Sequence, residues 1–424
     1  RLLCLGIEST AHTFGVSVVS FDGDVLSNER KLFTTESGGL IPYKLAEHHT
    51  DICDTIISQS LDKANLSMSD ISLISFSQSP GIGHALRVGA IVAKSLSVQN
   101  NIPLVGVNHC IAHLEIGRLK AKPKLLTVSR KQKNDSDCSS QNPETSLSTQ
   151  NLDTVPSSQS PDLGRHSLTP ERCQDPILLY ASGANTQIIG YEGKKYRIFG
   201  ETLDNGIGNF LDGFARYVGL GFPGGPKIQE LARKSSHYIP LPYTVKGMDV
   251  SFGGLQTKLK QLFDTGKYEL EDLCFSLQET AFAMLLEVSE RALAHTGKTE
   301  LLLGGGVACN TRLQEMAVRM CEDRGATCFV LDNEFNVDNA AMIAWTGIVT
   351  VSGGLGVESC GERGADDGNV DPDTGDSEDW GAGSSEPQIA KKHYVINEKY
   401  CTSLDDAEIK PYVRTDEVDI HWRE

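Results

Sequence analysis

The chain has 424 residues, of which 39% are hydrophobic and 22% are charged. That length predicts two or three domains with a sizeable core, which excludes a fibrous or wholly disordered protein. No apolar run approaches the ~18 residues of a membrane-spanning helix, so we expect no membrane partner. The formal net charge of −17 argues against a protein that binds nucleic acid by bulk charge alone. The 11 cysteines include no CxxC pair, which is typical of reduced thiols.

Two stretches lack the composition of a folded chain. Residues 120–175 are rich in Ser, Gln, Asn and Pro and contain no aromatic residue, so they offer little core to offset their ordering entropy. Residues 353–388 hold ten acidic residues and one basic residue, about half of the total net charge. We expect both to be disordered surface inserts. They divide the body into an N-terminal lobe, 1–119, and a C-terminal lobe, 176–352, whose end returns toward the first lobe. A tail, 389–424, is expected to pack on this body.

Outside the inserts, apolar runs typical of strands alternate with longer runs of helical periodicity. The predicted strands, in chain order, are 2–7, 14–20, 25–33, 71–77, 104–107, 177–181, 187–191, 196–199, 301–303 and 327–331. The predicted helices are 43–64, 84–99, 108–119, 206–218, 226–234, 270–295, 311–323 and 337–349. This alternation predicts an α/β protein.

The two halves open alike, with a strand, a tight polar turn, a second strand and an acidic–Gly turn. The sequences are GIESTAHTFGVSVVSFDG at 6–23 and YASGANTQIIGYEG at 180–193. A polar turn between strands presents N–H groups and hydroxyls that suit phosphate oxygens. Either turn alone fits an ordinary hairpin, but the duplication predicts two turns that face each other across a nucleotide cleft. The predicted fold is therefore a duplicated, two-lobed one, on the plan of actin, Hsp70 and sugar kinases.

A histidine pair and two glycine-rich turns are the other candidate sites. His109 and His113 lie four residues apart on a predicted helix, hence on one face, and that spacing lets two imidazoles share one metal ion. Packed or surface histidines give the same pattern. A zinc peptidase would need Glu directly after the first histidine, where Cys110 stands, so peptidase chemistry is disfavoured. The turns PGGP at 223–226 and GGGVACN at 304–310 suit either tight packing or close approach to a ligand.

Six motifs in one order carry a specific resemblance to a known family. They are PLVGVNHCIAHLEIGRL, YASGANTQ, ETLDNGIGNFLDGFAR, GFPGGPKIQELA, GGGVACNTRLQEM and VDNAAMIAWTG. Together they closely resemble the universal tRNA threonylcarbamoyl-transferases, called TsaD in bacteria and known in archaea and eukaryotes as the catalytic subunit of the KEOPS complex. GIESTAHTFG and RTDEVDIHWRE look like the archaeal–eukaryotic branch.

The resemblance implies an actin/Hsp70-type enzyme that holds threonylcarbamoyl-AMP between its lobes. It would transfer the threonylcarbamoyl group to the adenosine beside the anticodon of tRNAs that read ANN codons, releasing AMP, and ATP or AMP would occupy the same site. One divalent ion, iron or zinc, would be held by His109, His113 and Asp338, with Tyr180 close by. The implied substrate-binding residues are Tyr180, Ala181, Ser182, Gly183, Ala184, Asn185, Asp212, Gly225, Gln229 and Asn310. No residue is assigned as a general base.

The chain departs from the family pattern at four places. Ala184 replaces the second glycine of SGGNT, Gly213 replaces a lysine, Gln229 replaces a glutamate, and residues 41–44 replace an HPRE-like tetrad. The resemblance also implies tRNA, a small kinase-like subunit and a dimerising subunit as partners, and a cytoplasmic location with the nucleus as a second one. Two alternatives stay open at this point. One is a non-catalytic ATP-binding scaffold, which needs no metal-binding histidines, and the other is a sugar or small-acid kinase.

Overall fold

The computed structural model describes residues 1–34, 41–125, 172–353 and 395–423. The sequence inserts predicted to be disordered therefore lie, apart from their ends, outside the described residues. Each predicted strand and helix is present, with bounds that differ by no more than three residues from those expected. The nine cysteines that the structure describes are free thiols. Within the same ranges, no helix combines the length and the apolar character needed to cross a lipid bilayer.

The first lobe is built on a five-stranded sheet. Its strands, in spatial order, are β3 (Val25–Leu32), β2 (Thr13–Ser20), β1 (Leu3–Glu8), β4 (Leu73–Ser79) and β5 (Leu104–Asn108). Strand β1 pairs antiparallel with β2 and parallel with β4, and β4 pairs parallel with β5. The hairpin β1–β2 holds the first polar turn, because its register closes at the pair Glu8 and Gly15.

The second lobe repeats this sheet. Its strands, in spatial order, are β9 (Lys195–Glu201), β8 (Thr186–Glu192), β7 (Ile177–Ala181), β12 (Glu300–Gly304) and β13 (Thr327–Val330), followed by the short edge strand β6 (Lys122–Pro123). Here β7 takes the place of β1, since it pairs antiparallel with β8 and parallel with β12. The duplication predicted from the two similar openings is confirmed.

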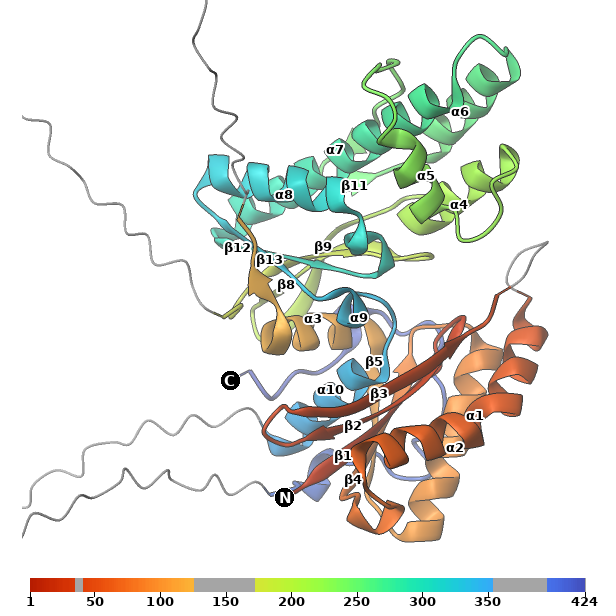
Figure 1. The fold of residues 1–424 in the computed structure, drawn as a ribbon. Helices are drawn as coiled ribbons and strands as arrows, with labels where there is room; N and C mark the ends of the chain where they lie inside the picture. Colours follow the sequence, from red (N-terminus) through yellow and green to blue (C-terminus); the bar gives the residue numbers. More distant parts are fainter. Residues whose placement is uncertain (35–40, 126–171, 354–394, 424) are drawn as a thin grey trace, which may run out of the picture.

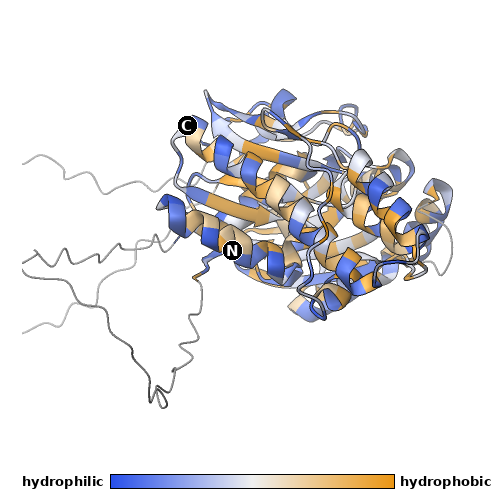
Figure 2. Ribbon diagram, turned by 90° about the horizontal axis from the view of Figure 1, so that it is seen from above, coloured by the Kyte–Doolittle hydropathy of each residue, from blue (hydrophilic) through white to orange (hydrophobic). Residues whose placement is uncertain are grey.

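Helices lie outside and between the two sheets (Figure 1). The outer face of the first sheet is covered by α1 (Pro42–Ala64) and α2 (Gly83–Asn100), and the space between the sheets holds α3 (His109–Lys120), α9 (Asn333–Asn336) and α10 (Ala340–Ser352). The second sheet is covered by α4 (Ile207–Tyr217), α5 (Gly225–Ala232), α6 (Gly253–Asp264), α7 (Leu270–Thr296) and α8 (Thr311–Arg324), with the small β-hairpin β10 (Val245–Lys246) and β11 (Asp249–Val250) beside it. Figure 2 shows hydrophobic residues along the central strands and hydrophilic ones on the outer turns of the helices.

Strand alternation decides which side chains face the interlobe space. Ile177 and Leu179 pack toward the outer helices, whereas Leu178 and Tyr180 pack in the core between the sheets. Successive strand residues point to opposite faces of the sheet. A polar residue that directly follows a residue of the outer core therefore points toward the other lobe. In β1, where Leu5 and Ile7 belong to the outer core, this rule puts the Glu8 side chain on the interlobe face. Tyr180 and Glu8 thus approach the same space from opposite sheets.

Helix α10 is far from β1 in sequence but packs directly on it. A Cβ added to Gly6 would lie 2.4 Å from the carbonyl oxygen of Ala340 and 2.6 Å from the amide nitrogen of Ala344, so only glycine allows this helix–strand approach. The Ser75 hydroxyl in β4 donates to the carbonyl of Ile343 at 2.8 Å. The helix was predicted from residue 337 but begins at Ala340, because the Asn339 side chain accepts from the Met342 amide and caps it. Helices α6 and α9 and the two-residue strands β6, β10 and β11 were not predicted.

Residues 395–423 form a C-terminal strap across both lobes. The Lys410 amide donates to the carbonyl of Gln78 in β4 at 2.9 Å, and the Arg414 guanidinium pairs with Glu201 in β9 at 3.1 Å. Further along, the Trp422 indole donates to the buried carboxylate of Glu115 in α3 at 3.0 Å. The strap therefore ties the N-terminal lobe, the C-terminal lobe and the central helix together.

Candidate functional site

Both polar turns line one cavity of about 960 Å³ between the lobes. The β1–β2 turn contributes Thr10 to Thr13, and the β7–β8 turn contributes Ser182 to Asn185. The two turns come from equivalent hairpins of the duplicated sheets, so they meet across the cleft as the sequence predicted. The floor of this cavity includes His109, Tyr180 and Asp338.

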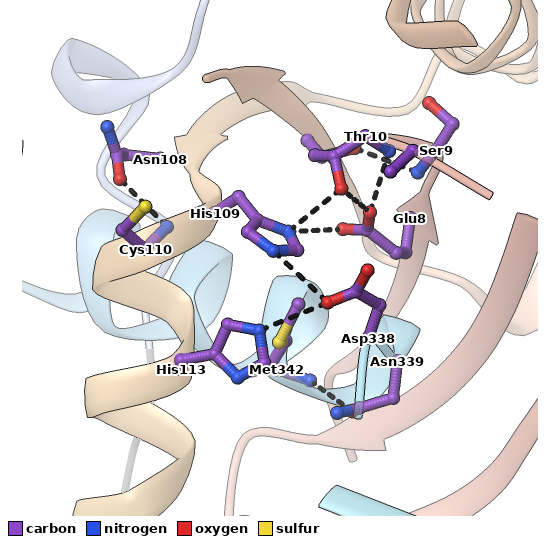
Figure 3. A network of polar contacts seen from close by, with 12 residues as sticks. Glu8, Ser9, Thr10, Asn108, His109, Cys110, His113, Asp338, Asn339 and Met342 are labelled. Atoms are coloured by element: carbon purple, nitrogen blue, oxygen red, sulfur yellow. Dashed lines mark hydrogen bonds and ion pairs between the residues drawn. The ribbon is translucent and has the colours of Figure 1, made fainter. Parts of the chain in front are cut away.

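A group of three potential metal ligands lies at that floor (Figure 3). The side chains of His109, His113 and Asp338 each offer one ligand atom, and these atoms lie within 4.8 Å of one another. Both histidine Nε2 atoms are 3.3 Å from the same oxygen, Oδ1 of Asp338. The histidines start helix α3, which Asn108 caps by accepting from two backbone amides. Asp338 lies in the loop before α10, where Asn339 donates to the carbonyls of Phe335 and Val337.

Glu8 and Thr10 orient His109 from the opposite side. Nδ1 of His109 lies 3.0 Å from Oε2 of Glu8, a fully buried carboxylate, and 3.3 Å from the Thr10 hydroxyl. The other oxygen of Glu8 accepts from the Thr10 amide at 2.7 Å and from the Thr10 hydroxyl. A carboxylate on Nδ1 leaves Nε2 as the ligating nitrogen, the usual arrangement around a metal-bound histidine. The sequence reading missed Glu8, although a charged residue on the inner face of a buried strand was the available signal.

The charges around His109 favour a cation at the position that its Nε2 faces. Burial alone would lower the pKa of His109, but the carboxylates of Glu8 and Asp338 raise it well above its ordinary value. Burial likewise would raise the pKa of Asp338, yet the two imidazoles hold it well below its usual range. His113 faces the same carboxylate, and burial lowers its pKa, so it is a neutral donor. Two acids and two imidazoles in a buried space are a coherent setting for a divalent ion.

The types of the ligand atoms indicate which metal ions suit this group. Two imidazoles and one carboxylate are typical ligands of zinc and of non-haem iron. Tyr180 is close enough to join them, since its hydroxyl lies 3.1 Å from Nε2 of His109 and its ring centroid 4.9 Å from that of His113. Burial raises the pKa of Tyr180 well above its ordinary value, so its hydroxyl stays protonated unless a cation stabilises the phenolate. The residues present therefore fit a metal ion.

The β7–β8 turn has free hydrogen-bond donors beside this group. Within the described residues, the amides of Gly183 and Ala184 donate to no protein acceptor, although both residues line the cavity. The turn itself is closed by the Ser182 amide, which donates to the carbonyl of Asn185 at 3.0 Å. Gly206 packs against the back of the turn, where an added Cβ would lie 2.4 Å from the Gly183 carbonyl. Free amides on a braced turn suit an anion such as a phosphate.

The remaining predicted residues separate into two groups. Asp212 lines the cavity, and its Oδ1 accepts from the Gly224 amide at 2.7 Å. Burial raises the pKa of this carboxyl, and the amides of Gly224 and Gly225 partly offset that effect. His113 is not in the cavity lining, and neither are four of the predicted substrate-binding residues, namely Ala181, Gly225, Gln229 and Asn310.

These four residues have other local roles. The Asn310 side chain caps α8 by accepting from the amides of Arg312 and Leu313, and its nitrogen donates to Gln278 at 2.9 Å. Gln229 donates to the Thr311 hydroxyl at 3.0 Å. Gly225 begins α5, and Ala181 is fully buried in the core of the second lobe. Their contribution to substrate binding stays a prediction.

The fold and the site together define a two-lobed protein of the actin, Hsp70 and sugar-kinase class, with a group of potential metal ligands at the floor of its cleft. Among solved structures, T. kodakarensis HypF has a similar fold, with a TM-score of 0.51 at 12% identity over 82% of this chain and 47% of that one.

Sequence comparison identifies the family. Residues 24–134 and 163–345 match the family described as "TsaD: tRNA N6-adenosine threonylcarbamoyltransferase". The protein of that name from Thermococcus kodakarensis is 46% identical over 354 residues, which cover 84% of this chain and 93% of that protein. The one from Thermofilum pendens is 44% identical, covering 84% and 91%. The chain belongs to the tRNA N6-adenosine threonylcarbamoyltransferase family, and the resemblance and enzyme class expected from its motifs are confirmed.

Proposed function

We propose that this chain transfers the threonylcarbamoyl group of threonylcarbamoyl-AMP to N6 of the adenosine beside the anticodon in tRNAs that read ANN codons. The observation that carries the proposal is that two polar turns line one cavity together with His109 and Asp338, which form one group of potential metal ligands with His113. A non-catalytic ATP scaffold needs the turns but has no use for the metal-binding group. The proposal therefore accounts for both halves of the site.

The reaction needs an oriented acyl donor and an incoming amine. The adenosine N6 attacks the carbamoyl carbon, the bond from that carbon to the phosphate oxygen breaks, and AMP leaves with the electron pair while the nitrogen loses one proton. The free amides of Gly183 and Ala184 are placed to hold the phosphate and to stabilise the negative charge that grows on it. Asp212, on the same wall, is placed to accept from a ribose hydroxyl.

The protein's own groups also prepare the cleft floor. Glu8 fixes the ring of His109, and Asn339 fixes the loop that carries Asp338. A divalent iron or zinc ion bound by His109, His113 and Asp338, with Tyr180 adjacent, would supply Lewis-acid activation of the carbamoyl group or hold the threonine moiety. Holding donor and acceptor in one cleft converts a bimolecular reaction into an effectively intramolecular one.

The test is direct. Purified protein is incubated with tRNA, threonine, bicarbonate, ATP and an adenylate-forming enzyme, and the tRNA nucleosides are then analysed by mass spectrometry. The expected result is threonylcarbamoyladenosine with the wild-type chain and none with Asp338→Ala. A wild-type protein that binds ATP but leaves the tRNA unmodified, even when assayed as the complex that co-purifies with it, would support the scaffold instead.

We further propose that the chain works in a KEOPS-type assembly with a small kinase-like subunit and a dimerising subunit, in the cytoplasm and the nucleus. The support is the likeness of GIESTAHTFG and RTDEVDIHWRE to the archaeal–eukaryotic branch, together with the archaeal sources of the relatives above. The acidic net charge is a second argument, because other subunits would then supply basic surface for tRNA. Co-purification of the tagged chain with two such subunits from its native cell is the check.

A further inference from the structure

A fully exposed aromatic side chain lies at the rim of the catalytic cavity. Tyr412, in the C-terminal strap, is 92% exposed, although its neighbour Pro411 lines the cavity. No other large hydrophobic or aromatic side chain that the structure describes is so exposed; the next is Val395 at 74%. A tyrosine ring in water contributes no packing to the fold, and its whole face is available to a binding partner.

The backbone that carries Tyr412 is held on both sides. The Pro411 carbonyl accepts from the Gly81 amide of the N-terminal lobe at 3.2 Å, and the Val413 amide closes a turn onto the Lys410 carbonyl at 3.3 Å. Two residues on, Arg414 pairs with Glu201 of the C-terminal lobe. The strap therefore carries Tyr412 on a held backbone, so no backbone entropy is lost when the ring binds a partner.

Cationic and imidazole side chains lie on the elements next to this position. Lys410 belongs to the same turn, and His84 and Arg87 lie on the first turn of α2, which starts beside Pro411: a Cβ on Gly83 would lie 3.6 Å from the proline ring. Arg216 lies on the cavity wall. All four residues are exposed, and none of their side chains forms an ion pair within the part of the chain that the structure describes. Unpaired cations beside an exposed ring are the combination that binds single-stranded nucleic acid.

We propose that Tyr412 is a stacking platform for the nucleobase next to the acceptor adenosine, with Lys410, His84 and Arg87 contacting the flanking phosphates. This inference rests on the proposed function. An adenosine that reaches the cavity floor must leave the base stack of its RNA loop, which costs a few kcal/mol. A tyrosine ring at the rim would stack on the neighbouring base in place of the adenosine that has left, because every base offers a π-face. Such stacking is worth ~1–3 kcal/mol per base.

The experiment compares Tyr412→Ala with Tyr412→Phe, which keeps the ring, and with Tyr268→Ala, another exposed tyrosine, located between α6 and α7. The Michaelis constant for tRNA is measured in the transfer assay, and the affinity for AMP by calorimetry. Tyr412→Ala should raise the KM for tRNA about 10- to 100-fold, with AMP affinity and melting temperature unchanged. Tyr412→Phe and Tyr268→Ala should stay within about two-fold of the wild type.

A KM for tRNA that is unchanged in Tyr412→Ala, or raised as much by Tyr412→Phe, overturns the proposal. A second readout separates it from the proposed reaction. Fluorescence anisotropy with a labelled RNA hairpin that carries the acceptor loop should show the same loss of affinity in Tyr412→Ala without any chemistry. Loss of hairpin binding together with an inactive wild type would support the stacking surface and refute the transferase proposal. An active wild type, together with unaffected hairpin binding in Tyr412→Ala, would support the transferase proposal and refute the stacking surface.

Discussion

Glu8, the last residue of β1, and His109, which directly follows β5, meet across 3.0 Å, Oε2 to Nδ1, in a buried space at the carboxyl edge of the first lobe's sheet. The contact gives a strand carboxylate control over the orientation of a helix histidine. A carboxylate that holds the other ring nitrogen of a metal-bound histidine is worth about 10- to 100-fold in metal affinity.

Glu8→Gln should therefore weaken zinc binding about 10-fold while the protein stays folded. The substitution keeps the size of the side chain and removes its charge, so the attraction for a cation at His109 Nε2 falls. Competition with a chromogenic chelator measures the affinity, and Glu47→Gln, an exposed acid on α1, is the control. Equal affinities in the two variants would show that Glu8 does not act on the metal site.

His109→Ala or Asp338→Ala should lose bound iron or zinc and transferase activity. Each variant removes one of three ligands, and two remaining protein ligands hold a divalent ion poorly. Elemental analysis gives the occupancy, and circular dichroism confirms that the fold is retained. Full metal occupancy in both variants would refute the ligand assignment.

Asp212→Ala should weaken AMP binding about ten- to a hundred-fold, since losing one charge-assisted hydrogen bond costs ~1.5–3 kcal/mol. Ala184→Gly should strengthen it, because the methyl group of Ala184 faces the cavity at the phosphate turn. Calorimetric titration with AMP measures both. Unchanged affinity in Asp212→Ala would place the ribose elsewhere.

Asn310→Ala should lower stability more than nucleotide affinity. Its side chain caps α8, and loss of an N-cap costs about 1–2 kcal/mol of unfolding free energy. Asn310→Asp keeps the capping oxygen and should therefore lose less unfolding free energy than Asn310→Ala. Denaturant unfolding and AMP titration on the same samples separate the two roles. A large drop in AMP affinity with unchanged stability would restore the nucleoside contact inferred from the motif.

His49 makes the fold sensitive to acid. Burial is the main cause that lowers its pKa from 6.5 to about 4, and its Nε2 donates to the carbonyl of Ala11, in the turn that lines the cavity. The unfolded chain therefore binds the proton more readily than the folded one between these pH values. Stability should fall by about 2–3 kcal/mol as the pH drops from 7 to 4.

His49→Gln, which retains an amide donor, should flatten that pH dependence, measured as urea unfolding at several pH values. The exposed His84→Gln is the matched control. If the His49 variant and the wild type lose the same stability over this range, other groups are responsible.

Periodicity predicted the strands of four or more residues and most helices, because their apolar residues repeat every second or every third to fourth position. It missed α6, whose sequence GGLQTKLKQLFD starts with two glycines and carries only a thin apolar stripe. The site was harder to predict from the sequence than the secondary structure. The spacing of His109 and His113 was visible, but Asp338 follows His113 by 225 residues and meets it only through the return of the chain to the first lobe. Its assignment came from the family motif, and Glu8, which no motif singled out, was found only from the structure.

The packing of α10 on β1 and β4 also sets an order of events during synthesis. The core of the second lobe draws on residues from one continuous stretch, Ile177 to Cys328. The first lobe cannot cover the inner face of its sheet so early, because Ser75 and its partner Ile343 are 268 residues apart. At about 5–20 residues per second, the ribosome needs roughly 15–50 s to add that length. The nascent first sheet therefore waits with an uncovered apolar inner face that a chaperone would have to shield.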